Sequence, residues 1–234
     1  MTELVSVNVS LEELREILQR EHFGYQRMPL PYGLSTQGID RSSTARLIFE
    51  EDLQGASVLD IGCCNGFFCY EAKRRNAGRV VGIEINPERY RHAQIFRQIY
   101  GIDIELRNDD FFSLLENDSF DYVLFLNVVH HLSDPIEALR KISAGTRKRL
   151  VIEFPTFSDH WYRREQKGMA SLISWFFNRI PLIGIGASTK GTRFVFSPQA
   201  IYRLLVVQTG LFRTVRLFPS PFREQGRYIA ICEK

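Results

Sequence analysis

The most informative stretch of this chain is Asp60-Ile61-Gly62-Cys63-Cys64-Asn65-Gly66. It follows a short apolar run, Ser57-Val58-Leu59, and precedes a helical pattern over Phe67–Arg75. A strand, a glycine-bearing turn and a helix in this order indicate a nucleotide site, because glycines let the backbone approach a ligand and the helix N-terminus offers free N–H groups. The dinucleotide fingerprint needs glycines at positions 62, 64 and 67, and this chain has cysteine and phenylalanine at the last two. The spacing therefore disfavours an NAD-dependent oxidoreductase.

The pattern that is present, D-x-G-x-x-x-G, is typical of proteins that bind S-adenosylmethionine. The next predicted strand, Arg79–Glu84, ends in an acid at close to the ~20-residue offset at which a carboxylate reaches ribose hydroxyls. Such a carboxylate accepts two hydroxyl hydrogen bonds and repels a 2′-phosphate. The alternative is that Glu84 only caps the helix that begins at Asn86-Pro87.

Composition fits one compact catalytic domain. The chain has 234 residues, of which 44% are hydrophobic, enough to bury the core of a single α/β unit. A formal net charge of +3 is too small to argue for nucleic acid by itself. The first residues show no secretory signal, and Cys63, Cys64, Cys69 and Cys232 do not form a disulfide framework. We therefore expect a cytoplasmic protein. We expect no metal site, since the side chains of adjacent cysteines point in divergent directions.

The order of elements predicts a helical N-terminal extension, residues 1–52, that packs on a core domain, residues 53–234. Alternating strands and helices predict a Rossmann-like α/β fold with a seven-stranded, mostly parallel sheet, helices on both faces and an antiparallel last strand. The predicted strands run over residues 57–59, 79–84, 102–107, 120–126, 149–154, 211–218 and 227–232. An aromatic-rich insertion, residues 155–196, interrupts the alternation.

Several motifs resemble those of class I S-adenosylmethionine-dependent methyltransferases. Val58–Gly62 resembles the first motif of the family, Val81–Glu84 resembles its ribose motif, and Phe120–Val123 with Val128–Pro135 resembles its fourth-strand motif. The resemblance covers roughly residues 54–154 and 197–233.

A narrower similarity connects Gly62–Phe67 and Pro31–Arg41 to the tRNA wobble-uridine carboxymethyltransferase group. One departure is Cys64, which stands where the family usually has glycine. Because cysteine favours an ordinary φ, we expect the turn to sit slightly differently over the methionine part of the cofactor.

The resemblance implies roles for individual residues around S-adenosylmethionine and its product, S-adenosylhomocysteine. Backbone near the cofactor would come from the turn, and the Asp60 carboxylate would orient that turn or contact the methionine amino group. The Glu84 carboxylate would hold the ribose. An acid with an aromatic ring would contact the adenine, and an amide would line the pocket near the methyl group. The implied cofactor-binding residues are Asp60, Gly62, Cys64, Gly66, Glu84, Asp110, Phe111 and Asn127, with Asp109 as the alternative to Asp110.

Methyl transfer asks mainly for alignment of the acceptor and exclusion of water, because the sulfonium is already activated. An oxygen or nitrogen acceptor with a proton to lose also needs a base, and His130 and His131 are the candidates. If this stretch is extended, adjacent side chains cannot both face the pocket. Structural or cofactor-shaping roles for the pair stay open.

The insertion is expected to choose the acceptor, since loops beyond the C-terminal strand ends carry specificity in α/β sheets. Trp161, Tyr162 and Trp175 are candidate substrate-binding residues, with Tyr32 and Arg41 from the upstream segment. The apolar run 172–177 is broken by polar residues and proline, so it falls short of the ~20 residues of a membrane span. It suits a lid over an apolar acceptor, a homodimer interface or ordinary core.

The sequence therefore predicts a methyltransferase that acts on an oxygen or nitrogen of a small organic metabolite. One alternative is a tRNA wobble-uridine modifying enzyme, for which an aromatic and basic cluster could clamp the anticodon. That enzyme could use a carboxylated cofactor, with Arg41 and Arg193 as conceivable cations near the transferred group. A second alternative is a pseudoenzyme that binds the cofactor without turnover.

Overall fold

The computed structural model describes residues 9–165, 174–188, 191–221 and 226–234. The chain forms two compact units, residues 1–111 and residues 112–234. They are called the N-terminal unit and the C-terminal unit below.

The N-terminal unit contains three parallel strands and the helices that follow them. β1 (Val58–Ile61) pairs in parallel with β2 (Val80–Ile83), and β2 pairs with β3 (Glu105–Arg107). All four residues of β1 and of β2 are buried, which explains their continuous apolar character. The helices of this unit are α1 (Leu11–Arg20), α2 (Ser42–Ile48), α3 (Phe67–Arg74) and α4 (Pro87–Tyr100), with a 3₁₀ turn, η1 (Pro31–Gly33).

The helix boundaries follow local sequence signals. Ser10 forms the capping box of α1 with Glu13, and Asn86 caps α4 ahead of its first-turn proline. Gly101 ends α4 in the left-handed conformation.

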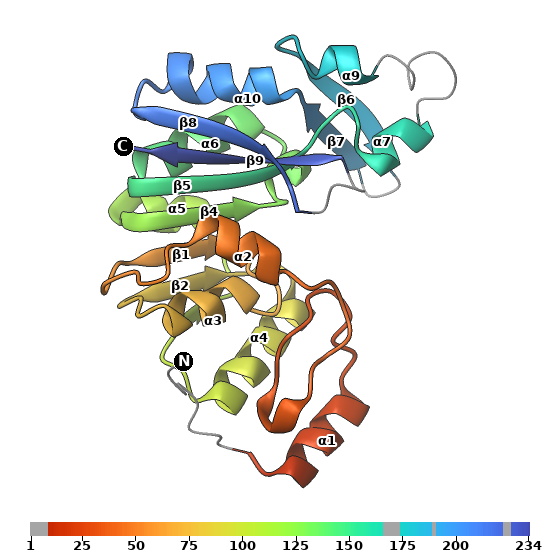
Figure 1. Ribbon diagram of the computed structural model, residues 1–234, viewed down its shortest axis with the longest axis vertical. Helices are drawn as coiled ribbons and strands as arrows, with labels where there is room; N and C mark the ends of the chain where they lie inside the picture. The colour runs from red at the N-terminus through yellow and green to blue at the C-terminus, as the bar shows by residue number, and fades with distance from the viewer. Residues whose placement is uncertain (1–8, 166–173, 189–190, 222–225) are drawn as a thin grey trace. The chain divides into compact units, whose positions relative to one another are not determined.

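The C-terminal unit contains four further strands of the main sheet: β4 (Phe120–Leu126), β5 (Thr146–Pro155), β8 (Thr214–Pro219) and β9 (Arg227–Glu233). β4 and β5 are parallel, whereas β9 runs antiparallel to both β5 and β8. α6 (Pro135–Ala144) packs on β5, and α10 (Pro198–Arg203) packs on β8 and β9 (Figure 1). The other helical segments are α5 (Phe111–Asn117), η2 (Val129–His131), α7 (His160–Glu165), α9 (Ser174–Phe177) and a π-helical turn, η3 (Leu204–Gln208).

The strand order of the sheet is β3-β2-β1-β4-β5-β9-β8. This order confirms the predicted Rossmann-like, mostly parallel, seven-stranded sheet with its antiparallel last strand. β4 has the predicted bounds, while β3 is shorter than predicted and β5 begins earlier.

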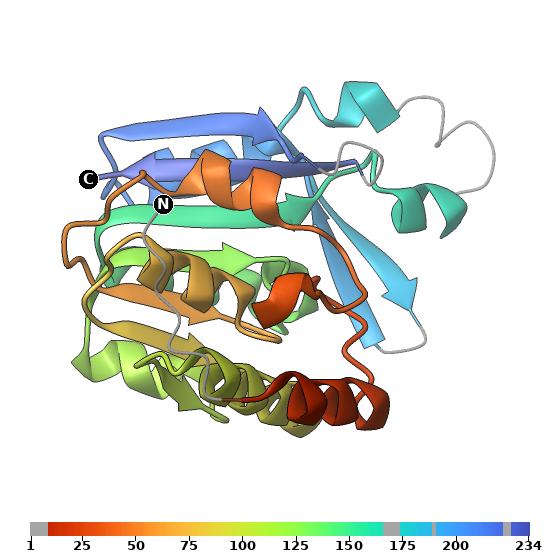
Figure 2. The ribbon, with the colours of Figure 1, turned by 60° about the horizontal axis from the view of Figure 1, so that its bottom comes forward.

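The insertion contains a hairpin that the sequence did not predict. β6 (Ile183–Ser188) and β7 (Gly191–Phe196) form a separate two-stranded antiparallel sheet, which Figure 2 shows in light blue. The Ile183–Gly186 stretch is expected from sequence to be flexible, but Gly184 lies where an added Cβ would come within 2.8 Å of Val195 and 2.9 Å of Phe157. Glycine there permits close packing of the hairpin, so its presence marks a contact rather than flexibility.

Candidate functional site: the turn after β1 and a buried polar network

The turn between β1 and α3 has three residues in the left-handed conformation. Gly62, Cys64 and Gly66 have φ values of 74°, 55° and 84°. The expectation that Cys64 takes an ordinary φ is therefore wrong. Its backbone N–H donates a hydrogen bond to Oε2 of Glu84 at 3.0 Å, which offsets the cost of this conformation for a residue with a Cβ.

We expect Cys64→Gly to keep the turn and its ligand affinity, and to raise the free energy of unfolding by about 0.5–1 kcal/mol through relief of the left-handed strain. Thermal unfolding and calorimetric titration with S-adenosylhomocysteine measure the two quantities. Asn76, which also has a positive φ of 59°, provides the matched control Asn76→Gly outside the turn. A loss of affinity specific to Cys64→Gly would show that the thiol itself contacts the ligand.

Glu84 is fixed at the end of β2 by the backbone. Its carboxylate accepts from the N–H groups of Cys64 at 3.0 Å and Asn86 at 2.9 Å, and only 4% of the residue is exposed. The Asn108 amide donates to the Glu84 carbonyl at 2.6 Å. Each carboxylate oxygen keeps further acceptor capacity. A preset carboxylate beside a turn rich in left-handed residues suits a ribose-bearing cofactor.

Asp60 lies in β1, just before the same turn, and is buried. Burial raises the pKa of its carboxyl to about 7, with a further increase from the charge of Glu84. The Cys69 thiol donates to Asp60 Oδ2 at 3.7 Å, and the positive charge of Arg41 acts in the opposite direction to burial. Arg41 is itself buried, with its guanidinium 5.3 Å from the centroid of the Phe68 ring. Arg41 thus belongs to the surroundings of Asp60.

The segment before α2 contacts the turn directly. The backbone N–H of Asn65 donates to Gln26 Oε1 at 3.2 Å, and the Asn65 side chain donates to the Gln26 carbonyl at 3.4 Å. Gln26 was not predicted, because nothing local distinguishes it from other surface-type amides. Tyr32 is 53% exposed, and its hydroxyl donates to the carbonyl of Val9.

The adenine-contact candidates lie just after β3. Asp110 is exposed, and its backbone N–H donates a hydrogen bond to Asp109 Oδ1 at 2.7 Å. Phe111, the first residue of α5, is buried. An exposed acid thus lies next to a buried aromatic ring, and the contact of both with the adenine stays a prediction.

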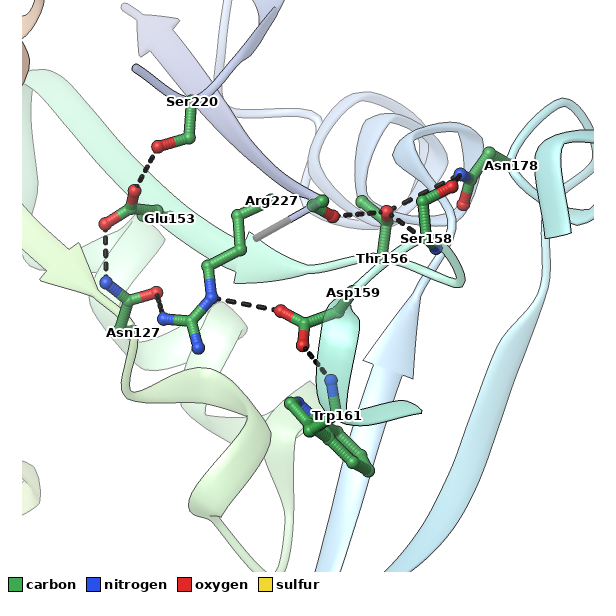
Figure 3. A network of polar contacts seen from close by, with 10 residues as sticks. Asn127, Glu153, Thr156, Ser158, Asp159, Trp161, Asn178, Ser220 and Arg227 are labelled. Atoms are coloured by element: carbon green, nitrogen blue, oxygen red, sulfur yellow. Dashed lines mark hydrogen bonds and ion pairs between the residues drawn. The ribbon is translucent and has the colours of Figure 1, made fainter. Parts of the chain in front are cut away.

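A buried polar network occupies the C-terminal unit (Figure 3). Asn127, which has a φ of 62°, donates to Glu153 Oε2 at 2.5 Å and accepts from Arg227 Nη1 at 2.6 Å. Arg227 Nε donates to Asp159 Oδ2 at 3.0 Å, and the Ser220 hydroxyl donates to Glu153 Oε1 at 2.6 Å. Both ends of the Asn127 amide are bound within this network. Its predicted place in a pocket near the transferable methyl group stays a prediction.

Both candidate bases lie on η2 rather than on an extended segment. The 3₁₀ turn brings the rings of His130 and His131 side by side, with centroids 4.0 Å apart. His130 is 2% exposed, whereas His131 is exposed. Burial lowers the pKa of His130 well below its ordinary value, and the charges of His131, Arg227 and Arg193 lower it further. His130 is therefore a neutral imidazole near pH 7.

The substrate-binding candidates of the insertion fall into two groups. Tyr162 packs edge-to-face on Phe157, and Trp161 lies next to it, so both are half-buried. Trp175 is 58% exposed, and the Arg179 guanidinium lies over its ring, 4.4 Å from the ring centroid.

Trp175 and Arg179 line a cleft of about 1060 Å³ within the C-terminal unit. The other lining residues are Ser158, Asn178, Pro198, Gln199, Leu217, Pro219, Gly226, Arg227 and Tyr228. Trp161 and Tyr162 do not line this cleft and so do not share it with Trp175.

Three charged members of the network were not predicted as site residues. Glu153, Asp159 and Arg227 come from β5, the turn before α7 and the start of β9. Arg227 follows Asn127 by 100 positions in the chain. The signal that could have found them is their position at the edge where α/β sheets bind ligands. Glu153 lies near the end of β5, Asp159 follows that strand, and Arg227 begins the antiparallel β9, opposite the last residue of β5.

The described residues offer neither a metal site nor a helix that could span a membrane. Within the described ranges, no three His, Cys, Asp or Glu side chains gather in a way that could hold a metal ion. No helix in the same ranges has the length and apolar character needed to cross a bilayer.

Curated relatives and solved structures resemble this chain. The tRNA U34 carboxymethyltransferase of Desulfotalea psychrophila is 29% identical over 143 residues, which cover 57% of this chain and 44% of that protein. The enzyme of the same name from Campylobacter hominis is 30% identical over 101 residues, covering 40% of this chain and 33% of that protein. The chain thus spans less than half the length of these relatives.

Among solved structures, the N-terminal domain of EvdMO1 with SAH bound superposes with a TM-score of 0.69 at 14% identity, covering 98% of both chains. Magnesium protoporphyrin IX methyltransferase (ChlM) from Synechocystis PCC 6803 gives 0.57 at 19% identity, covering 82% of this chain and 80% of that one. These similarities support the fold. Residues 52–176 match the Methyltransf_31 family model, a methyltransferase domain, over more than half of the chain. The chain therefore belongs to this methyltransferase domain family.

Proposed function

We propose that this enzyme transfers the methyl group of S-adenosylmethionine to an oxygen or nitrogen of a small organic acceptor. The observation that carries the proposal is the cleft of about 1060 Å³ that Trp175, Arg179 and Arg227 line within one unit. Its size lies near the upper end of small-molecule pockets, and its lining mixes an aromatic face with cations.

His130 is the base in this proposal; it does not line the cleft, but Arg227, which does, lies close enough to lower its pKa. Its imidazole is buried and neutral, and no described residue lies within hydrogen-bonding distance of its Nδ1. A neutral ring with an unused nitrogen can accept the proton that the acceptor loses as the methyl group arrives. Arg227 is held by Asn127 and Asp159 and keeps positive charge near that ring, which favours loss of the proton afterwards.

The cofactor side of the proposal rests on Glu84 and Asp60 of the N-terminal unit. Glu84 would accept hydrogen bonds from the ribose, and Asp60 would face the positively charged amino group of the methionine part. A cation brought next to a buried carboxyl with a pKa of about 7 lowers that pKa, so binding should expel the proton.

We expect S-adenosylhomocysteine to release up to about one proton per molecule bound near pH 6.5, because Asp60 is mostly protonated before binding. Calorimetry in two buffers of different ionisation enthalpy measures the release, and Asp60→Asn should abolish it. Without ligand, the folded protein holds this proton from the unfolded pKa of about 3.9 up to about 7, so stability falls as pH rises through that window. An unchanged proton count in Asp60→Asn would contradict the contact.

A second candidate function is modification of a tRNA wobble uridine, which the names of the curated relatives favour. That function requires many phosphate contacts. Affinity for tRNA would then fall steeply with salt, by about one log unit per log unit of salt for each phosphate contacted. A small-molecule enzyme should show no such dependence.

The deciding experiment screens methyl transfer to tRNA and to a fractionated metabolite pool, and then tests Trp175→Ala on the acceptor found. We expect KM for a small acceptor to rise about tenfold or more, because the indole ring offers a large contact area in the cleft. Affinity for S-adenosylhomocysteine should stay at the wild-type value. Phe176→Ala is the matched control, since that ring is 49% exposed and does not line the cleft. Full activity of Trp175→Ala would overturn the role of the cleft.

A further inference from the structure

Among the buried polar atoms of the C-terminal unit that no described residue satisfies, three belong to neighbouring elements. They are Nδ1 of His130, Nε1 of Trp161 and Nε of Arg193. Arg193 and Trp161 are neighbours, because the guanidinium lies 5.5 Å from the centroid of the indole ring. β7, which carries Arg193, packs against η2, which carries His130. An unsatisfied buried polar atom is unfavourable, so three in one region indicate a missing partner.

Arg193 and Arg227 differ in their partners. Arg227 forms an ion pair with Asp159 at 3.0 Å, and this pair is neutral as a whole. Arg193 is half-buried and forms no ion pair with a carboxylate of the described residues. Both arginines are close enough to His130 to lower its pKa. A partly desolvated arginine without a counter-ion favours binding of an anion.

The chemistry of the unpartnered atoms points the same way. The indole N–H and the guanidinium N–H can only donate, whereas the imidazole Nδ1 can accept. A ligand that satisfies the two donors must offer acceptor atoms, and the charge of Arg193 favours a negative group. The imidazole can then serve a neighbouring hydroxyl or amine of the same ligand.

We propose that Arg193 and Trp161 bind an anionic group of the methyl acceptor, a carboxylate or a phosphate, and that this contact places the acceptor next to His130. The inference rests on the proposed function, and it names the chemical class of the acceptor. Arg193 and Trp161 are binding residues in this assignment, and His130 receives the proton. The network in Figure 3 supports the site from one side, since Asp159 Oδ1 accepts from the backbone N–H of Trp161 at 3.1 Å.

Fluorescence of Trp161 tests the site without an identified acceptor. The chain has two tryptophans, so a Trp175→Phe background leaves Trp161 as the single reporter. Sodium phosphate and sodium acetate are titrated separately at constant ionic strength against sodium chloride. We expect a saturable change with one of the two anions, which identifies phosphate or carboxylate as the preferred group, and none with chloride. Arg193→Gln should weaken this binding at least tenfold, while Arg193→Lys should retain part of it.

Arg203→Gln is the matched control, because Arg203 is an exposed arginine of the same unit. Equal responses to all three anions, or unchanged binding in Arg193→Gln, would overturn the proposal. Competition of the bound anion with S-adenosylhomocysteine would also overturn it, since the site would then belong to the cofactor side. Methylated products are expected in the metabolite fraction that an anion exchanger retains, and products in the neutral fraction alone would contradict the assignment. If tRNA alone is methylated while Arg193-dependent anion binding persists, the proposed function fails and the anion site stands.

Discussion

Glu84→Ala should weaken binding of S-adenosylhomocysteine by about 30- to 1,000-fold. Two ribose hydroxyl groups would lose a charged acceptor, and hydrogen bonds to charged groups contribute roughly 1.5–3 kcal/mol each. The change also leaves the N–H groups of Cys64 and Asn86 without their acceptor. We therefore expect a lower free energy of unfolding as well, by about 1–3 kcal/mol. Calorimetric titration gives the affinity, and chemical denaturation gives the stability.

Two further variants separate these effects. Glu88→Ala removes an exposed acid from the first turn of α4 and should change neither quantity appreciably. Glu84→Gln keeps one carbonyl acceptor and should give an intermediate loss of affinity. Wild-type affinity in a well-folded Glu84→Ala protein would exclude the ribose contact and leave Glu84 as a residue that only organises the turn.

His130→Gln should reduce kcat by about 10²- to 10⁴-fold, the usual range for loss of a general base. Affinity for S-adenosylhomocysteine should stay within about twofold of wild type, because the substitution removes proton transfer rather than cofactor contacts. Burial holds the pKa of His130 below its ordinary value of 6.5, so the neutral form persists when the pH falls below 6.5. Wild-type kcat should therefore show no decline from this group between pH 8 and pH 6.5. Rapid-quench measurement of a single turnover isolates the chemical step.

The neighbouring histidine provides the sharpest comparison. His131→Gln should leave most of the rate, since His131 is exposed, and His160→Gln serves as a control at an exposed histidine of α7. A large loss in His131→Gln together with a small loss in His130→Gln would reverse the assignment. Equal small losses in both would leave alignment of the acceptor as the main source of catalysis.

The strand–turn–helix unit around Asp60 could be predicted because its signals are local. Buried parallel strands appear as continuous apolar runs, and glycines mark a turn that needs positive φ. The bounds of β4 were predicted correctly for the same reason. The left-handed conformation of Cys64 could not be predicted, since its compensation comes from Glu84, which lies 20 positions further along the chain.

Long-range contacts explain the other differences. Gly184 indicates flexibility when only its neighbours in sequence are considered, yet it packs against Phe157 and Val195. Asn127 could be singled out because it follows β4, but its partners Glu153 and Arg227, from β5 and β9, could not be predicted from its neighbours in sequence. Local patterns thus predict which elements form, while pairing between distant strands determines which polar side chains meet.

The four cysteines of the chain make it possible to follow opening of the two units separately. All four thiols are free and buried, and burial raises the pKa of Cys64 to about 12. A thiol reagent reacts with the thiolate, so labelling of each cysteine has to wait for local unfolding that exposes it. Cys63, Cys64 and Cys69 would report on the turn after β1, and Cys232 would report on β9. Labelling kinetics followed by mass spectrometry would therefore measure the opening free energy of each unit in the unmodified protein, and would show which of the two a bound ligand stabilises.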